Sequence, residues 1–216
     1  MKSKTDISQI RFKYKTDSLD IKNTSNDPFV QFKKWLNEAI RNKVFEPTAM
    51  ALSTLNSFKK VSNRIVLLKG IENKSFVFYT NLRSRKSNEI KLNKNVAAVF
   101  WWPQIGKQVR IEGSVSLVKN KEADQYFSTR SRKSQIGAWA SDQSSIVKDR
   151  KTLFERFKII EKRFENKDVK RPIFWSGYHI KPLLIEFWQG RENRLHDRII
   201  YKKINKIKWK KYRLNP

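Results

Sequence analysis

Five short β-rich segments follow one another between residues 48 and 118, and this series constrains the fold more than any other feature. They read TAMALSTL, NRIVLLKG, SFVFYTNL, NVAAVFWW and QVRIEGSVSLV, and one short helical segment, SRKSNEIKLN, interrupts them. Strands at such regular spacing, without βαβ alternation, are typical of antiparallel barrels and sandwiches. We therefore predict a mainly antiparallel β-barrel core.

Helical patterns flank these strands. Asp27 as N-cap and Pro28 in the first turn predict a helix that places Phe32 and Trp35 on one stripe. Further helices are expected from about Asn120 and in DRKTLFERFKIIEKRF, with SRKSQIGAWASDQSS as a polar, irregular segment between them. Strands return in GYHIKP, LLIEFWQG, RIIYKK and KWKKYRL.

This order of elements predicts an α+β domain around a β-barrel. The polar, mixed-charge residues 1–26 are expected to form a mobile N-terminal arm, and residues 27–216 a single domain. No run of about 18 apolar residues is present, so no membrane span is expected. The chain has no cysteine, which fits a reducing cytoplasm. It has two histidines, which makes a metal site improbable.

The net charge of +28, from 48 Lys and Arg against 20 Asp and Glu, first raises nucleic acid as a partner. The charge is spread along the chain, however, and its densest stretch, YKKINKIKWKKYRLNP, alternates lysine with apolar residues like an exposed strand. We therefore expect no specific nucleic-acid binding.

No hydrolytic or nucleotide motif (GxSxG, Walker loop, GxGxxG or HExxH) is present. The chain offers instead cationic and hydroxyl residues beside the expected strand ends, the groups that recognise phosphate. Two such clusters would suit two phosphates, and Trp188 could wall a flat ring, which indicates a cofactor site. Taken singly, Arg64 and Lys69 could be ordinary strand-end charges, His196 a surface histidine, and Trp188 a packing residue.

Several segments together resemble the pyridoxine/pyridoxamine 5′-phosphate oxidase family. They are RIVLLK, VFYTNL with SRK, QVRIEG, YFSTRSRKSQIGAWASDQSS, EFWQG, RLHDR and the terminal RLNP, in matching order over nearly the whole chain. The resemblance implies an FMN-binding split β-barrel, mainly antiparallel with flanking helices, that works as a homodimer. It also implies oxidation of pyridoxamine or pyridoxine 5′-phosphate to pyridoxal 5′-phosphate by O2, with release of hydrogen peroxide.

The resemblance assigns each site residue a role. FMN is expected to contact Arg64, Ile65, Val66, Leu67, Leu68, Lys69, Tyr79, Thr80, Arg85, Lys86, Gln108, Gln143, Ser144, Trp188 and Arg198. The substrate is expected to contact Arg11, Tyr14, Lys69, Tyr126, Arg130, Ser134, Arg194, Leu195 and His196. Arg194 and His196 are the expected catalytic residues, since they would orient the substrate's C4′ against the flavin.

Some positions depart from the family's usual pattern: Arg83 before the SRK run, Ser131 in place of a proline, and Gly106-Lys107 before Gln108. Arg191 is expected to be a turn residue that faces water. The alternative to the oxidase is an FMN- or haem-binding split-barrel protein with another substrate. The complete set of substrate residues favours the oxidase.

Overall fold

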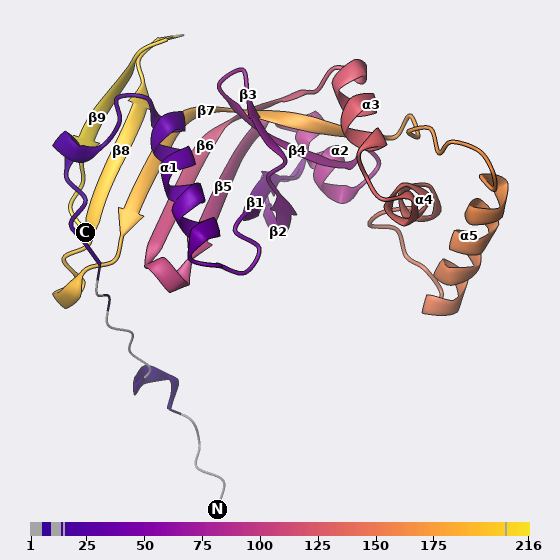
Figure 1. Ribbon diagram of the computed structural model, residues 1–216, viewed down its shortest axis with the longest axis horizontal. Coiled ribbons are helices and arrows are strands. Elements are labelled where there is room, and N and C mark those ends of the chain that lie inside the picture. The colour runs from indigo at the N-terminus through magenta and orange to yellow at the C-terminus, as the bar shows by residue number, and fades with distance from the viewer. Residues whose placement is uncertain (1–5, 10–13, 15, 206) are drawn as a thin grey trace, which may run out of the picture. The chain divides into compact units, whose positions relative to one another are not determined.

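The computed structural model of the protein describes residues 6–9, 14, 16–205 and 207–216. Its helices are α1 Pro28–Arg41, α2 Arg85–Leu92, α3 Asn120–Ser128, α4 Arg132–Ala140 and α5 Arg150–Arg163 (Figure 1). Its strands are β1 Ala49–Leu55, β2 Val61–Leu67, β3 Gly70–Glu72, β4 Ser75–Asn81, β5 Asn95–Trp102, β6 Lys107–Leu117, β7 Trp175–Gln189, β8 Asp197–Lys203 and β9 Trp209–Arg213. The predicted α+β class and the mainly antiparallel pairing are confirmed.

The described residues form two compact units. Unit 1 comprises residues up to 47, 100–110 and 184–216, and unit 2 comprises 48–99 and 111–183. Strands β5, β6 and β7 each contribute residues to both units.

Unit 2 contains the strands that the sequence predicted most clearly. Strand β1 pairs with β2 along its whole length, with Ala49 opposite Leu67, and its centre pairs with β5. Strand β4 pairs with β3 on one side and β7 on the other, with Phe76 opposite Ile180. Phe76, Phe78 and Ile180 are fully buried and form part of the core, as a two-sided packed sheet requires.

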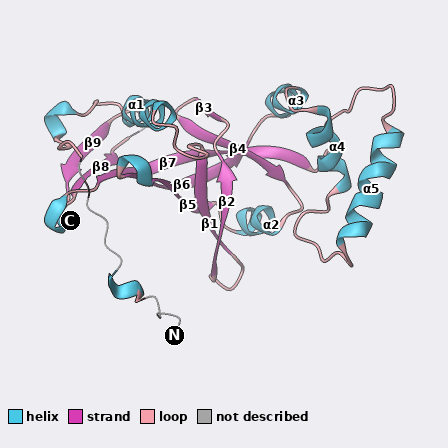
Figure 2. Ribbon diagram, turned by 60° about the horizontal axis from the view of Figure 1, so that its bottom comes forward, coloured by secondary structure: helices cyan, strands magenta, loops and turns pink. Residues whose placement is uncertain are grey.

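Helices α4 and α5 of unit 2 pack against each other (Figure 2). Helix α5 confirms the helix predicted in DRKTLFERFKIIEKRF; Phe157 and Ile160, with Phe164 at its C-terminal end, pack on a buried cluster that includes Ile136 and Trp175. Helix α4 lies where we expected an irregular segment, so that prediction was wrong. Its sequence has a weak apolar stripe, and burial of Ile136 against its tertiary neighbours decides the conformation.

Unit 1 contains helix α1, which the sequence predicted. The Asp27 carboxylate accepts a hydrogen bond from the backbone N–H of Phe29 at 2.7 Å, and Pro28 occupies the first turn. The buried stripe of α1 packs edge-to-face on the strands: Phe32 contacts Phe100, with ring centroids 5.0 Å apart, and Trp35 contacts Phe187 at 5.1 Å.

Strand β7 is one continuous strand where the sequence indicated two. Its first part pairs with β4, and its last part, Leu184 to Gln189, pairs with β8. Pro182 lies between these two pairings and interrupts neither. A Cβ at Gly113 of β6 would overlap the Lys181 carbonyl oxygen, so a glycine is required where these backbones meet.

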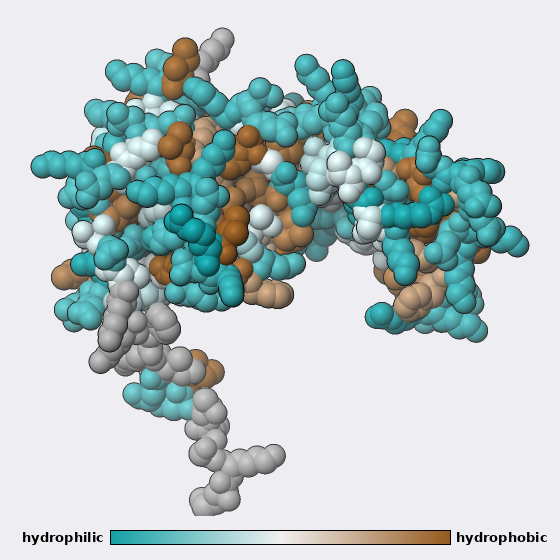
Figure 3. Space-filling view, viewed as in Figure 1, coloured by the Kyte–Doolittle hydropathy of each residue, from teal (hydrophilic) through white to brown (hydrophobic). Residues whose placement is uncertain are grey.

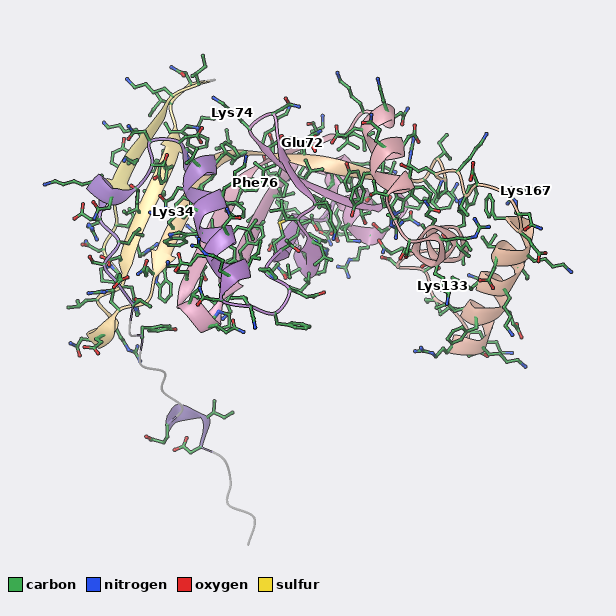
Figure 4. All side chains as sticks on the ribbon, viewed as in Figure 1. Lys34, Glu72, Lys74, Phe76, Lys133 and Lys167 are labelled. Carbon is green, nitrogen blue, oxygen red and sulfur yellow. The ribbon has the colours of Figure 1, made fainter. Side chains whose placement is uncertain are left out.

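The view in Figure 3 shows a mostly hydrophilic surface with scattered apolar patches. The positive charge is distributed in the same way: Lys34, Lys74, Lys133 and Lys167 come from four separate segments and all are exposed (Figure 4). No helix in the described ranges is long and apolar enough to cross a membrane.

Candidate functional site

A cavity of about 740 Å³ lies within unit 2. It is lined by Arg64, Ile65, Val66, Leu67, Lys69, Tyr79, Thr80, Asn81, Lys86, Tyr126, Arg130, Ser131, Ser134, Gly137, Ala138, Ser141, Gln143 and Trp175. Nine of the fifteen expected FMN contacts are in this list, and so are four of the nine expected substrate contacts, Lys69, Tyr126, Arg130 and Ser134. The volume is typical of a pocket for a small-molecule cofactor or ligand.

Strands β2 and β4 supply one wall of the cavity. Arg64 lies opposite Leu52 in the β1–β2 ladder, and the chain leaves β2 so that the backbone N–H of Lys69 donates to Val77 of β4 at 2.8 Å. Strand β4 contributes Tyr79 and Thr80, and α2 begins shortly after it.

Lys86 is the buried cation of this wall. Its ammonium donates to Thr80 Oγ1 at 3.1 Å, Ser84 Oγ at 3.3 Å and Gln143 Oε1 at 2.8 Å. Burial, and then the positive charge of Arg64, lower the pKa of Lys86 to about 8. A bound anion would relieve both effects, so the lysine suits a phosphate site.

Arg130 is a second cation of the cavity wall; it is half-buried and is held by aromatic faces. Its guanidinium carbon lies 4.7 Å from the Trp175 ring centre and 5.5 Å from that of Phe127. Its NH1 is buried and has no hydrogen-bond partner in the described part of the chain, and burial lowers its pKa. A buried, unsatisfied guanidinium nitrogen in a cavity wall indicates an anionic ligand.

Aromatic rings stack next to Arg130. Tyr79 and Tyr126 lie nearly parallel with centroids 4.0 Å apart, and Trp175 is parallel to Tyr79 at 5.4 Å. Burial raises the pKa of both tyrosines, so their hydroxyls remain protonated donors.

A second group of expected residues lies within unit 1. Trp188 and His196 have centroids 4.7 Å apart, and Tyr14 meets both edge-on at 5.6 and 5.8 Å. His196 Nδ1 accepts a hydrogen bond from the backbone N–H of Arg191 at 3.0 Å. Burial, and then the charge of Arg194, lower the pKa of His196. The imidazole is therefore neutral at pH 7, with its proton on Nε2.

Glu186 of β7 organises the arginines of this second group. Its buried carboxylate accepts from Arg198 Nε at 2.7 Å and from Arg110 NH2 at 2.8 Å. Gln108 is half-buried on β6. Arg194 and Leu195 are exposed, and Arg194 has a positive φ of 60°.

The expected residues thus fall into one group in each unit, and a few stand outside both. Arg11 lies outside the described residues. Leu68 is buried behind the strand, Ser144 is exposed with φ 73°, and the Arg85 side chain is largely exposed; none of the three lines the cavity.

The structure gives a physical reason for the residues at three positions that depart from the family's usual pattern. Ser131 is the N-cap of α4 and accepts from the backbone N–H of Ser134. Gly106 has a left-handed φ of 59°, and a Cβ there would overlap Tyr14. Arg83 lies 4.5 Å over the Phe174 ring. Arg191 lies at the start of the turn Glu192–Arg194, as expected, but its side chain donates to the Thr16 carbonyl, so the expectation that it faces water was wrong.

The sequence did not single out Trp175 or Glu89. Trp175 stacks under Arg130, and the buried Glu89 carboxylate bonds Arg64 and Arg85. Glu89 had one local signal in the sequence, its i,i+4 spacing from Arg85, and Trp175 had none. Within the described residues, no group of three His, Asp or Glu side chains is placed to hold a metal ion.

Two family models match the chain. Pyridoxamine 5′-phosphate oxidase matches residues 36–163, and the pyridoxine 5′-phosphate oxidase C-terminal dimerisation region matches residues 175–216. A pyridoxine/pyridoxamine 5′-phosphate oxidase of Leptospira interrogans is 47% identical over 97% of this chain and 98% of its own length.

Solved structures agree with these matches. PhzG of Burkholderia lata, in complex with tetrahydrophenazine-1-carboxylic acid, is 28% identical with a TM-score of 0.86, over 93% of this chain and 99% of that one. A pyridoxamine 5′-phosphate oxidase-related, FMN-binding protein of Nostoc punctiforme is 14% identical with a TM-score of 0.70, over 89% and 100% of the two chains, and shows the same split-barrel fold. The chain belongs to the pyridoxamine 5′-phosphate oxidase family.

Proposed function

We propose that the protein oxidises pyridoxamine 5′-phosphate or pyridoxine 5′-phosphate to pyridoxal 5′-phosphate, with FMN as cofactor. The amine, O2 and water give the aldehyde, ammonia and hydrogen peroxide; the alcohol and O2 give the aldehyde and hydrogen peroxide. Relatives named pyridoxine/pyridoxamine 5′-phosphate oxidase match the chain over nearly its whole length, which supports the proposal.

One observation carries the proposal at the level of the site. A single cavity contains two separate cationic centres, Lys86 with Arg64 and Arg130 with its unsatisfied NH1. FMN and the substrate each carry one phosphate, so two centres match two ligands. The unsatisfied guanidinium nitrogen fits the substrate phosphate, with Tyr126, Ser134 and Lys69 as further donors in the same cavity.

FMN bound in this cavity would supply the hydride-accepting chemistry for oxidation at C4′ of the substrate, with O2 as the final oxidant. Lys86, Arg64 and Thr80 would hold its phosphate, and the backbone from Ile65 to Leu67 would bind along it. These groups are already in place through the protein's own hydrogen bonds.

The second group of residues, around His196, would align the substrate. His196 offers an Nε2–H donor because the Arg191 amide occupies Nδ1, so it can hold an oxygen or anionic group of the substrate without a charge change. Arg194 would place its cation at the pyridine ring. Tyr14 contacts His196 and would close over the substrate together with Arg11. Alignment of this kind can be worth several kcal/mol.

We propose a homodimer in which both subunits contribute to the site. The match of residues 175–216 to a dimerisation region supports it, because this stretch includes Trp188, Arg194, His196 and Arg198. Light scattering tests the assembly, and a stable, fully active monomer would contradict it. A cytoplasmic location is part of the same proposal and is tested by cell fractionation.

The decisive experiment is an absorbance spectrum of the purified protein followed by a peroxide assay. We expect a flavin spectrum and stoichiometric peroxide release with pyridoxamine 5′-phosphate. A protein that does not bind FMN would overturn the proposal. A flavoprotein that releases no peroxide with either phosphorylated vitamer would instead be a split-barrel protein with another substrate.

A further inference from the structure

Glu89 is a buried carboxylate that the proposed reaction does not use. It lies in the second turn of α2, and its side chain is 5% exposed. A buried negative charge beside a phosphate site opposes anion binding unless it has another task.

The carboxylate connects two strands to the helix. Oε2 accepts from Thr54 of β1 at 2.5 Å, from Ser62 of β2 at 2.6 Å and from Arg64 at 3.1 Å. Oε1 accepts from Arg85 Nε at 2.9 Å. Burial alone would raise its pKa, but these bonds and the charge of Arg64 lower the pKa to about 2, so it is ionised at pH 7.

Arg64 is fixed in one orientation as a result. Its NH1 donates to the Leu52 carbonyl and Thr54, and its NH2 donates to Ser62 and Glu89. The four terminal hydrogens are therefore used, and Nε has no hydrogen-bond partner within the described ranges. The Nε–H is the donor that remains available to a ligand in the cavity that Arg64 lines.

Arg85 depends on the same carboxylate in a different way. Its side chain is 65% exposed, and the described residues offer it no ion partner other than Glu89. The bond uses Nε and ties this side chain, which does not line the cavity, to the carboxylate that also binds Arg64.

Local helix stabilisation does not explain this carboxylate. An Arg N-terminal to a Glu at i,i+4 is the less favourable orientation of such a pair, and an exposed pair of this kind would not need burial. Three of the four bonds run instead to the neighbouring strands.

We propose that Glu89 is a positioning residue for flavin phosphate recognition: it holds Arg64 so that its free Nε–H meets the phosphate of FMN, and it holds Arg85 at the start of α2, outside the cavity lining. The inference rests on the proposed function, since it assumes that FMN is the ligand. It predicts an effect that depends on the phosphate and not on the isoalloxazine ring.

A purely electrostatic role of Glu89 predicts the opposite change in FMN affinity. If Glu89 acted only through its charge, its neutralisation would remove a repulsion and tighten FMN binding. If it positions Arg64, neutralisation weakens the hold on that guanidinium and loosens FMN binding. The two readings differ in the sign of the change.

The experiment titrates FMN and riboflavin into flavin-free protein and follows flavin fluorescence, with Glu89→Gln and Glu89→Ala compared with the unaltered chain. We expect the Kd for FMN to rise roughly 10-fold in Glu89→Gln and more in Glu89→Ala, as for the loss of a charge-assisted hydrogen bond. The Kd for riboflavin should not change.

Glu38→Gln is the matched control. Glu38 pairs with the buried Lys107 at 2.5 Å in unit 1 and does not line the cavity, so its loss lowers stability without touching the phosphate site. Circular dichroism melting shows which variants fold. Should Glu89→Ala not fold, Ser62→Ala, which removes one hydroxyl donor of the carboxylate, should give a smaller loss confined to FMN.

Unchanged or tighter FMN binding in folded Glu89→Gln would overturn the inference, and so would an equal loss of riboflavin affinity. Failure of the unaltered chain to bind FMN would instead overturn the proposed function. The two failures are therefore distinguishable in one set of titrations.

Discussion

Arg64 and Arg130 line the same cavity, yet the protein holds them in opposite ways. Arg64 is paired with a buried carboxylate and two hydroxyls, so its charge is compensated before any ligand arrives. Arg130 rests on the faces of Trp175 and Phe127, and its NH1 has no partner in the described part of the chain. A compensated arginine gives a fixed site for a resident cofactor, and an uncompensated one gives a site that gains most from an incoming anion.

The largest effect is expected from removal of the uncompensated arginine. Arg130→Ala should raise the KM for pyridoxamine 5′-phosphate about 100-fold, because a desolvated, bidentate charge pair is lost. Steady-state peroxide assays measure this, and the Kd for FMN should stay unchanged. Arg132→Ala is the matched control, since Arg132 donates to the carbonyls of Phe164 and Lys167 and does not line the cavity. An equal loss of FMN affinity in Arg130→Ala would remove the distinction between the two arginines.

FMN binding to the side of the cavity that contains Arg64 and Lys86 should depend on pH. Lys86 has its pKa lowered to about 8 in the free protein, and a phosphate dianion beside it would favour the protonated form. Binding then takes up a proton above pH 8, so the Kd for FMN should be flat from pH 7 to 8 and rise by up to about tenfold per pH unit above it.

Fluorescence titrations from pH 7 to 9.5 measure this slope, above the second ionisation of the phosphate near pH 6. Lys86→Met should weaken FMN binding at pH 7 and remove the slope. A slope that persists in Lys86→Met would assign the titration to another group.

Trp175 allows the aromatic support of Arg130 to be tested separately. Trp175→Leu should raise the KM for the phosphorylated substrate about fivefold with kcat unchanged, since a cation–π contact of one to two kcal/mol is lost. Trp139→Leu is the matched control: Trp139 lies 5.3 Å from the Arg163 guanidinium and does not line this cavity. A similar rise in KM in both variants would indicate general loosening of the α4–α5 region instead.

The contacts of Arg64 and Arg130 also show which features of the fold the sequence could predict and which it could not. Periodicity and capping gave α1 and the strands between 48 and 118, because those signals are local. Helix α4 was missed since burial of Ile136, and not its own pattern, stabilises it. The partners of Arg64 and Arg130 were invisible, because Thr54, Glu89 and Trp175 reach them only through strand register and tertiary packing.

The site residues themselves came from the resemblance and not from spacing. Motif by motif, Arg64 or His196 could have been an ordinary surface residue. The structure brings the cavity group together around Lys86 by its hydrogen bond to the distant Gln143, and the aromatic group around His196 by ring contacts with Tyr14. Which donors remain free, such as Arg130 NH1, depends on that packing, so no sequence pattern could have indicated it.

The smallest effect is expected at Ser131, which follows Arg130 and starts α4. Its hydroxyl oxygen accepts from the Ser134 backbone N–H, so Ser131→Ala should lower the free energy of unfolding by about 1 kcal/mol. Ser131→Pro should cost less, because the position has φ −57°, which proline adopts without strain and which restricts the unfolded chain.

Urea denaturation of the flavin-free protein measures both changes at Ser131, and neither variant should alter the KM by more than about twofold, because Ser131, although it lines the cavity, is exposed and is not an expected substrate contact. Ser131→Ala and Trp175→Leu should therefore differ in their effect on KM, because the rings of Trp175 and Phe127, and not the start of α4, contact the Arg130 guanidinium. If Ser131→Ala raised the KM as much as Trp175→Leu, the helix cap and not the aromatic stack would set the position of the guanidinium. If Ser131→Pro were the less stable of the two, proline would strain the backbone at this position, because both variants lack the hydroxyl.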